Sequence, residues 1–347
     1  MKNNSAASLS VLVVGFGFSA NTFHLPFLRH FSDVDIAGVV SSRPEMVAQT
    51  LPDVPVWSSL DEALAARRFD AVVITTPNHL HANQAEQALL AGCHVLVEKP
   101  FTLTASEASR LVALAARRQR VMCVYQNRRF DGDFLTLRAL INDKRVGEVR
   151  RLESRFDRFR PVPRDRWREN DGPGSGITWD LAPHLIDQAL VLFGMPVAVT
   201  ARIATLRDGG KSDDCFDIDL IYKEKLISLG SSPFQAGATL RYDLQGTAGS
   251  FRKFGLDPQE NQLKQGVVFS DPDWAQTPGN EHGSFHGEST SETIITQRGG
   301  YLTFYRQFLD AISGRGLPPV SPEEAINVIR LTEIAFASSQ QQNTLRL

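Results

Sequence analysis

The sequence predicts an α/β domain with a doubly wound parallel sheet, followed by an α+β domain with an open, mostly antiparallel sheet. Up to residue 125, near-continuous β-branched runs alternate with helical patterns, as in parallel sheets covered on both faces. After residue 126, several strand-like runs follow one another without helices between them. A length of 347 residues suits two domains, which we place at residues 1–125 and 126–347.

The first domain is expected to contain five strands and four helices. The apolar runs that we interpret as strands are 9–14, 36–40, 71–75, 94–97 and 121–125. The helical patterns lie near 20–31, 59–66, 80–91 and 104–118. The apolar run at 9–18 also resembles a short secretory signal, but Gly15 and Gly17 interrupt it, so a buried strand entering a glycine turn fits better.

The second domain is expected to bind substrate and to carry the oligomer contacts. Its predicted helices are 131–143, 177–193, 300–313 and one that begins at the capping box of Ser321 and Glu324. The predicted strands are 148–159, 197–206, 214–222, 225–231, 238–245 and 249–254. Residues 257–299 are polar and rich in turn formers, so we expect a surface excursion there. We expect the helix from about 321 to pack back on the first domain.

The composition excludes several classes of protein. The 37 Lys and Arg residues against 39 Asp and Glu give a net charge of −2, which offers no field for binding nucleic acid or an anionic membrane surface. No apolar run approaches the ~20 residues that cross a bilayer. The three cysteines form no C-x-x-C pair. We therefore expect neither a disulfide framework nor a metal cage, and a cytoplasmic location.

A glycine motif directly follows the first predicted strand and opens the first helix. Gly15 permits a tight turn, Gly17 lets a pyrophosphate approach the backbone, and Ala20 allows close packing of helix on strand. The phosphates would then meet free N–H groups and the positive end of the helix dipole. In this strand–turn–helix context, the G-x-G-x-x-A pattern predicts dinucleotide binding.

The end of the second strand indicates which dinucleotide binds. NAD sites place an Asp or Glu there, whereas this chain has Ser41, Ser42 and Arg43. Two hydroxyls and a guanidinium suit the 2′-phosphate of NADP. Arg43 could instead be a solvated loop residue, with Glu45 close enough to serve as an NAD ligand. We favour NADP and keep NAD as the alternative.

Four segments together resemble one known family: GFGFSA at 15–20, TTPNHLH at 75–81, EKP at 98–100 and DLAPHLID at 180–187. With them, nearly the whole chain resembles the glucose–fructose oxidoreductase / inositol dehydrogenase (Gfo/Idh/MocA) family. The segments FHLP, QNRRFDGDF and GLDPQENQL are similar to its NADP-linked scyllo-inositol dehydrogenase-like branch. The resemblance implies an N-terminal Rossmann domain, a C-terminal open-sheet domain and an active site between them. It also implies that the Lys, Asp and His of these motifs are catalytic.

The chemistry of these residues agrees with that role. Oxidation of an alcohol needs a hydride acceptor, a base for the hydroxyl proton and a cation beside the developing oxyanion. A bound nicotinamide would accept the hydride, His184 the proton, and Lys99 would polarise the oxygen. Asp180, four residues before His184, shares a helix face with it. Asp187 is expected to be a structural partner of a nearby arginine. The alternatives are that His184 only packs and that Lys99 is solvated.

The predicted contacts to cofactor and substrate extend over both domains. The expected cofactor-binding residues are Gly15, Phe16, Gly17, Phe18, Ala20, Ser41, Ser42, Arg43, Thr76, Pro77, Asn78, His81, Glu98 and Lys99. The expected substrate-binding residues are Tyr125, Asn127, Arg128, Trp167, Asp180 and His184. For His81, capping or packing is as strong an interpretation as a site role. The Lys99–Pro100 bond is a candidate for a cis peptide.

Two further clusters carry weaker signals. Residues 150–168 contain eight arginines, partly offset by acidic residues, and we interpret them as a strand and loop beside the substrate cleft rather than a nucleic-acid surface. The pairs His282 with His286 and His79 with His81 lack further ligands at metal spacing. We therefore predict no metal site, which argues against a metal-dependent alcohol dehydrogenase.

The sequence as a whole predicts an NADP-dependent dehydrogenase. It would interconvert a secondary alcohol and a ketone on a polyol, inositol or sugar ring by hydride transfer. The alternatives are a reductase of another small carbonyl or of a tetrapyrrole, and a non-catalytic NADP-binding regulator. We also expect a homodimer or homotetramer, because the open sheet must bury one face and its strands carry Phe216, Ile218, Leu220 and Leu229.

Overall fold

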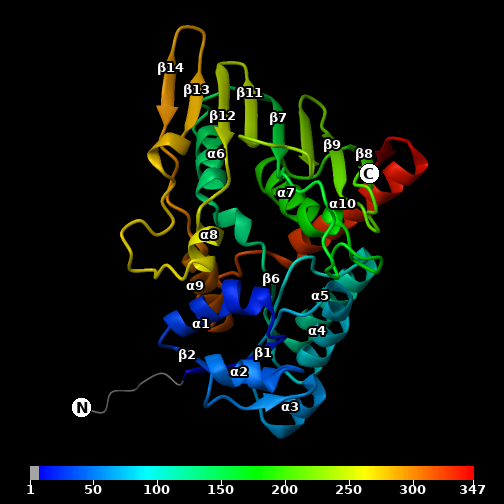
Figure 1. The fold of residues 1–347 in the computed structure, drawn as a ribbon, viewed down its shortest axis with the longest axis vertical. Coiled ribbons are helices and arrows are strands. Elements are labelled where there is room, and N and C mark those ends of the chain that lie inside the picture. The colour runs from blue at the N-terminus through cyan, green and yellow to red at the C-terminus, as the bar shows by residue number, and fades with distance from the viewer. Residues whose placement is uncertain (1–7) are drawn as a thin grey trace. The chain divides into compact units, whose positions relative to one another are not determined.

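The computed structural model describes residues 8–347, which form two compact units (Figure 1). The first unit holds the chain up to Tyr125 together with residues 263–267 and 302–325. The second unit holds residues 126–262, 268–301 and 326–347. The first seven residues of the expected N-terminal domain lie outside the described part of the chain.

The first unit is built on a six-stranded parallel sheet with the order β3-β2-β1-β4-β5-β6. Its strands are β1 (Leu9–Val14), β2 (Val34–Val40), β3 (Val56–Trp57), β4 (Ala71–Ile74), β5 (His94–Val97) and β6 (Met122–Val124). The apolar runs produce these strands because helices cover both faces of the sheet. The predicted doubly wound sheet is confirmed, and the two-residue β3 is an addition to it.

Helices connect these strands and cover the sheet. They are α1 (Leu25–His30), α2 (Pro44–Thr50), α3 (Leu60–Ala66), α4 (His81–Leu90) and α5 (Ala105–Arg118), with α9 (Tyr301–Ile312) added from the C-terminal part of the chain. Before α1, residues Ala20–His24 form a π-helical turn, in which the N–H of Leu25 bonds to the carbonyl of Ala20. Pro26 has no N–H for the ordinary bond to residue 22, which favours this wider turn.

The second unit contains a nine-stranded sheet with the order β14-β13-β12-β11-β7-β10-β9-β8-β15. The strands are β7 (Val149–Arg155), β8 (Ala198–Ala204), β9 (Cys215–Ile221), β10 (Leu226–Ser231), β11 (Leu240–Gly246), β12 (Gly249–Phe254), β13 (Gly283–His286), β14 (Ser291–Ile294) and β15 (Leu345–Arg346). Only β7 and β10 pair in parallel, and the other neighbours are antiparallel. The predicted mostly antiparallel sheet is confirmed.

One face of this sheet is covered by helices, which form the core of the unit. The helices of the unit are α6 (Gly132–Asn142), α7 (Ile177–Phe193), most of α8 (Gln259–Lys264) and most of α10 (Pro322–Gln341). Leu185 of α7 and Leu331 of α10 are fully buried in the same apolar cluster as strand residues of β9 and β10. Trp179 of α7 also stacks on Phe336 of α10, with 5.4 Å between the ring centroids.

Two expectations for the C-terminal half are corrected. Phe216, Ile218, Leu220 and Leu229 do not lie on an uncovered face, because all four are buried under the helices while the alternating positions between them are polar and exposed. Residues 257–299 are not only a surface excursion, since β13 and β14 extend the sheet. Most of α10 packs within the second unit, and α9 supplies the helix that returns to the first.

Among residues 8–347, no helix combines the length and the apolar character needed to cross a membrane.

Candidate active site

The glycine turn after β1 has the backbone geometry that the motif predicts. Gly15 has a φ of +92°, and a Cβ there would lie 2.8 Å from Oγ1 of Thr75. That hydroxyl donates to the carbonyl of Val14 over 3.0 Å, so the neighbouring strand fixes the turn. Beside Gly17, by contrast, a Cβ would meet no atom within 4 Å. The turn is thus tight at its first glycine and open at its second, which fits a pyrophosphate approaching the backbone.

Arg43 lies beside this turn. Its Nη2 donates to the carbonyl oxygen of Phe16 over 3.3 Å, and its backbone N–H donates to Oγ of Ser41 over 3.0 Å. The guanidinium is therefore held at the glycine turn, although the side chain is exposed. Ser42 is also exposed, and Glu45 lies in the first turn of α2. A cation and two hydroxyls at the end of β2 fit the 2′-phosphate of NADP.

We expect Arg43→Ala to raise the KM for NADP⁺ and to leave the KM for NAD⁺ nearly unchanged. The lost charge-assisted hydrogen bond should weaken NADP⁺ binding by roughly 1.5–3 kcal/mol. Steady-state kinetics with both cofactors measure the effect, with Arg117→Ala, an exposed arginine at the end of α5, as the matched control. Equal changes for the two cofactors would refute the assignment of Arg43.

A buried polar cluster supports the loop that carries Lys99. His24, in the π-helical turn, bonds through Nε2 to Oε1 of Glu98 at 3.0 Å and through Nδ1 to the hydroxyl of Tyr305 at 2.5 Å. Ser19 also donates to Oε1 of Glu98. The second carboxylate oxygen accepts the backbone N–H of Lys99 over 3.1 Å.

This cluster keeps Glu98 ionised. Burial raises the pKa of the Glu98 carboxyl, but the hydrogen bond and charge of His24, the charge of Lys99 and the hydrogen bond from Ser19 outweigh it and lower the pKa to about 2. Sequence reasoning assigned Glu98 to the cofactor and missed His24 and Ser19. The signal for His24 was present in FHLP, where a proline in the first helix follows a histidine by two residues.

His81 joins two loops of the first unit. Its Nδ1 lies 2.7 Å from the carbonyl oxygen of Pro100, and its Nε2 lies 2.9 Å from that of Thr76. The side chain is fully buried, so it ties the loop after β4 to the loop after β5. Asn78 begins the 3-10 turn before α4 and is also buried. The predicted cis Lys99–Pro100 bond is confirmed.

Helix α7 presents the acidic and basic side chains predicted to act on the substrate. Asp180 lies in its first turn and is half-buried, and His184 follows one turn later with only 4% of its surface exposed. Asp187, a further turn along, is held by Arg129 through two hydrogen bonds of 2.6 and 2.7 Å. The expected structural partnership of Asp187 with an arginine is therefore confirmed. Lys99 belongs to the first unit, while Asp180 and His184 belong to the second.

Two of the predicted substrate contacts lie in buried parts of their units. Tyr125 is 1% exposed, with its ring centroid 4.6 Å from that of His24 and 4.8 Å from that of Phe304. Asn127 is also buried, whereas Trp167 is exposed. No contact in the structure tests these residues as ligands, so their substrate role stays a prediction.

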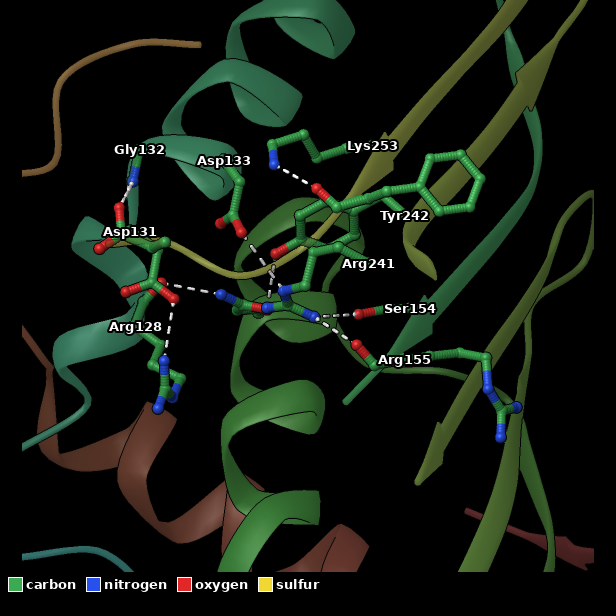
Figure 2. Close-up of polar contacts among 12 residues, drawn as sticks. Arg128, Asp131, Gly132, Asp133, Ser154, Arg155, Arg241, Tyr242 and Lys253 are labelled. Carbon is green, nitrogen blue, oxygen red and sulfur yellow. Dashed lines mark hydrogen bonds and ion pairs between the residues drawn. The ribbon is translucent and has the colours of Figure 1, made fainter. Parts of the chain in front are cut away.

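Arg128 belongs to a buried ionic cluster of the second unit (Figure 2). Its guanidinium pairs with Glu260 at 2.6 Å and with Asp131 at 3.3 Å, and it lies over the ring of Phe156. Nearby, the fully buried Arg241 donates to Oε1 of Gln188 over 2.7 Å. Arg128 thus has carboxylate and aromatic partners within the second unit, and its contact with substrate stays a prediction.

An open pocket lies next to Asp180 in the second unit. It is lined by the start of α7, by arginines from the segment after β7 and by residues just after β10. From the sequence, we expected the arginines of residues 150–168 to lie beside a substrate cleft. Within the described chain, no group of three or more His, Cys, Asp or Glu side chains is arranged to hold a metal ion.

Comparisons with known proteins agree with this architecture. The profile of an oxidoreductase family's NAD-binding Rossmann fold matches residues 9–126, and that of the same family's C-terminal alpha/beta domain matches residues 138–347. The uncharacterized oxidoreductase YdgJ of Escherichia coli is 42% identical, covering 98% of this chain and 99% of its own. The scyllo-inositol 2-dehydrogenase (NADP(+)) IolW of Bacillus subtilis is 36% identical, covering 98% of this chain and 96% of its own.

Solved structures show the same fold. The Bacillus subtilis protein yvaA has a TM-score of 0.93 at 34% identity, and the match covers 98% of each chain. The Yersinia pestis protein YPO2259 also has a TM-score of 0.93, at 39% identity, covering 99% of this chain and 98% of its own.

The fold and the matched profiles define an oxidoreductase with a nicotinamide-binding Rossmann domain. The chain belongs to the Gfo/Idh/MocA family, and it is a dehydrogenase of the class that acts on CH–OH groups.

Proposed function

We propose that the protein uses NADP to interconvert a secondary alcohol and a ketone on a polyol, inositol or sugar ring. The observation that carries this proposal is the arrangement on α7, where Asp180 borders an open pocket and His184 follows one turn later. The relative IolW, an NADP(+)-linked scyllo-inositol dehydrogenase by name, supports the same substrate class. Arg43 at the glycine turn supports NADP over NAD.

The proposed mechanism assigns one task to each residue. When bound, the nicotinamide ring supplies the hydride acceptor for alcohol oxidation and the hydride donor for ketone reduction. His184 takes the hydroxyl proton during oxidation and returns it during reduction. Lys99 stabilises negative charge on the same oxygen, and Glu98 positions Lys99 by accepting its backbone N–H. Asp180 orients a neighbouring substrate hydroxyl.

The remaining site residues are proposed in the same sense. The glycine turn at 15–20, the residues Ser41 to Arg43 and the loop at 76–81 would hold the cofactor, with the first unit as the cofactor domain. The second unit would hold the substrate. Association into a homodimer or homotetramer stays a prediction. The argument from an uncovered apolar sheet face no longer supports it, because the exposed positions of β9 are polar. Light scattering at micromolar concentration would measure the state.

A substrate screen tests the proposal. Reduction of NADP⁺ or NAD⁺ is followed by absorbance with a panel of inositols, polyols and sugars. We expect turnover with at least one cyclic polyol and a higher kcat/KM with NADP⁺. Turnover confined to non-hydroxylated carbonyl compounds or to tetrapyrroles would overturn the proposed substrate class.

A further inference from the structure

The pocket beside Asp180 is lined largely by charged side chains. Four carboxylates line it. Five arginines line it as well, namely Arg158, Arg160, Arg166, Arg168 and Arg207. All of them belong to the second unit. Four of the five positive charges could be cancelled by the four carboxylates, so the pairing of each arginine decides which charges are left for a ligand.

Three of these arginines have carboxylate partners. Arg207 pairs with Glu169 at 2.8 Å and with Asp214 at 3.0 Å, and both of its partners are buried. Arg166 pairs with the same Glu169 at 2.5 Å. Arg168 approaches Asp180 at 3.6 Å. Three of the four carboxylates that line the pocket, Glu169, Asp180 and Asp214, are therefore paired with these arginines.

Arg158 and Arg160 lack such partners. Within residues 8–347, neither guanidinium has a carboxylate within 4.0 Å. Their backbone N–H groups bond to the carbonyls of Ser232 at 2.9 Å and Pro233 at 2.7 Å, which holds the segment extended. Because side chains two apart on an extended segment share a face, both arginines reach the same pocket, as its lining confirms.

The two guanidinium groups are also half-buried and lie among other positive charges. Burial lowers the pKa of Arg158, the negative charges of Asp180 and Glu260 partly oppose this, and the positive charges of Arg128 and Arg166 lower it further. Burial together with the charges of Arg158, Arg164 and Arg166 lowers the pKa of Arg160 to about 10. A bound anion would relieve both effects, because guanidinium groups bind carboxylates and phosphates through paired, charge-assisted hydrogen bonds.

We propose that Arg158 and Arg160 bind an anionic group of the substrate, a carboxylate or a phosphate, while the polyol part of the same molecule lies against Asp180. Among polyols and sugars, the preferred substrate is then one that carries an acidic or phosphate group. This inference rests on the proposed function, because that function assigns Asp180 to the reacting part of the site.

Binding measured without turnover tests the inference. Gluconate supplies a carboxylate, glucose 6-phosphate supplies a phosphate, and glucose is the neutral reference, each titrated by calorimetry into protein saturated with NADP⁺. We expect at least one of the two acids to bind at least 10-fold more tightly than glucose, and the stronger of the two identifies the anion. Weaker or equal binding of both acids relative to glucose would overturn the proposal.

Variants locate the effect. Arg158→Gln and Arg160→Gln should each weaken binding of the preferred acid by about 10- to 100-fold and leave binding of glucose unchanged. Arg150→Gln removes an exposed charge near the other end of the same segment and should change neither. Should Arg158→Gln fail to fold by circular dichroism, Arg160→Gln decides alone. Unchanged acid binding in the folded variants would overturn the proposal.

The two proposals can fail separately. Acid binding that depends on Arg158 and Arg160, without NADPH formation from any polyol, supports the anion site and overturns the proposed function. Oxidation of neutral rings with the same KM in wild type, Arg158→Gln and Arg160→Gln, together with unchanged binding of the acids, supports the proposed function and overturns the anion site.

Discussion

His184→Ala lowers kcat roughly 10²- to 10⁴-fold in the expected result, the usual range for loss of a positioned general base. The side chain is 4% exposed on α7, one turn after Asp180, so a base there is fixed in place by the helix. NADPH binding, followed by fluorescence, should persist because the glycine turn and Arg43 belong to the first unit. Near-normal turnover in this variant would exclude His184 as the base.

Lys99→Ala should be comparably damaging, because the developing alkoxide loses its cation. If both residues act on one oxygen, the double variant should fall far short of the product of the two losses. His286→Ala is the matched control, since His286 is exposed on β13 and outside the proposed site. Independent, multiplicative losses would show that Lys99 and His184 do not act as a unit.

The second large effect is on stability. We expect Asp187→Ala to lower the free energy of unfolding by about 3–5 kcal/mol, because it leaves the buried guanidinium of Arg129 without its carboxylate. Urea denaturation followed by fluorescence measures the change. Glu148→Ala, which removes an exposed partner of Lys144, should cost at most about 1 kcal/mol.

A double substitution separates burial of an unpaired charge from loss of favourable pairing. Arg129→Met combined with Asp187→Leu removes both charges and keeps apolar volume in the site. Since buried pairs gain little over apolar replacements, the double variant should be more stable than Asp187→Ala. A double variant less stable than Asp187→Ala would contradict this account of the pair.

Much of the fold follows from sequence patterns because its strands bury whole side chains. Residues 71–74 and 95–97 are apolar throughout, and helices cover both faces of β4 and β5. β13 and β14 were not predicted because their sequences are mostly polar. Phe285 is the main residue that they contribute to the core. The two residues of β3 are too few to form a pattern.

The site was predictable where a backbone requirement selects a residue type, as at Gly15. It was not predictable where function depends on contacts between distant segments. The bond between His24 and Tyr305 joins residues 281 positions apart, which no local pattern records. Likewise, the eight arginines between 150 and 168 gave no sign of which ones would pair with a carboxylate and which, like Arg158 and Arg160, would have none within 4.0 Å among the described residues.

The return of α9 to the first unit has a consequence for biosynthesis. Tyr305 stacks on Phe27 with 5.0 Å between ring centroids, bonds to His24, and lies beside the buried Phe304. A nascent chain that has emerged from the ribosome only as far as residue 125 lacks the rings of Phe304 and Tyr305. The nucleotide-binding domain therefore lacks part of its core while it emerges from the ribosome. That core is completed only when α9, which lies in roughly the last tenth of the polypeptide, has been synthesised.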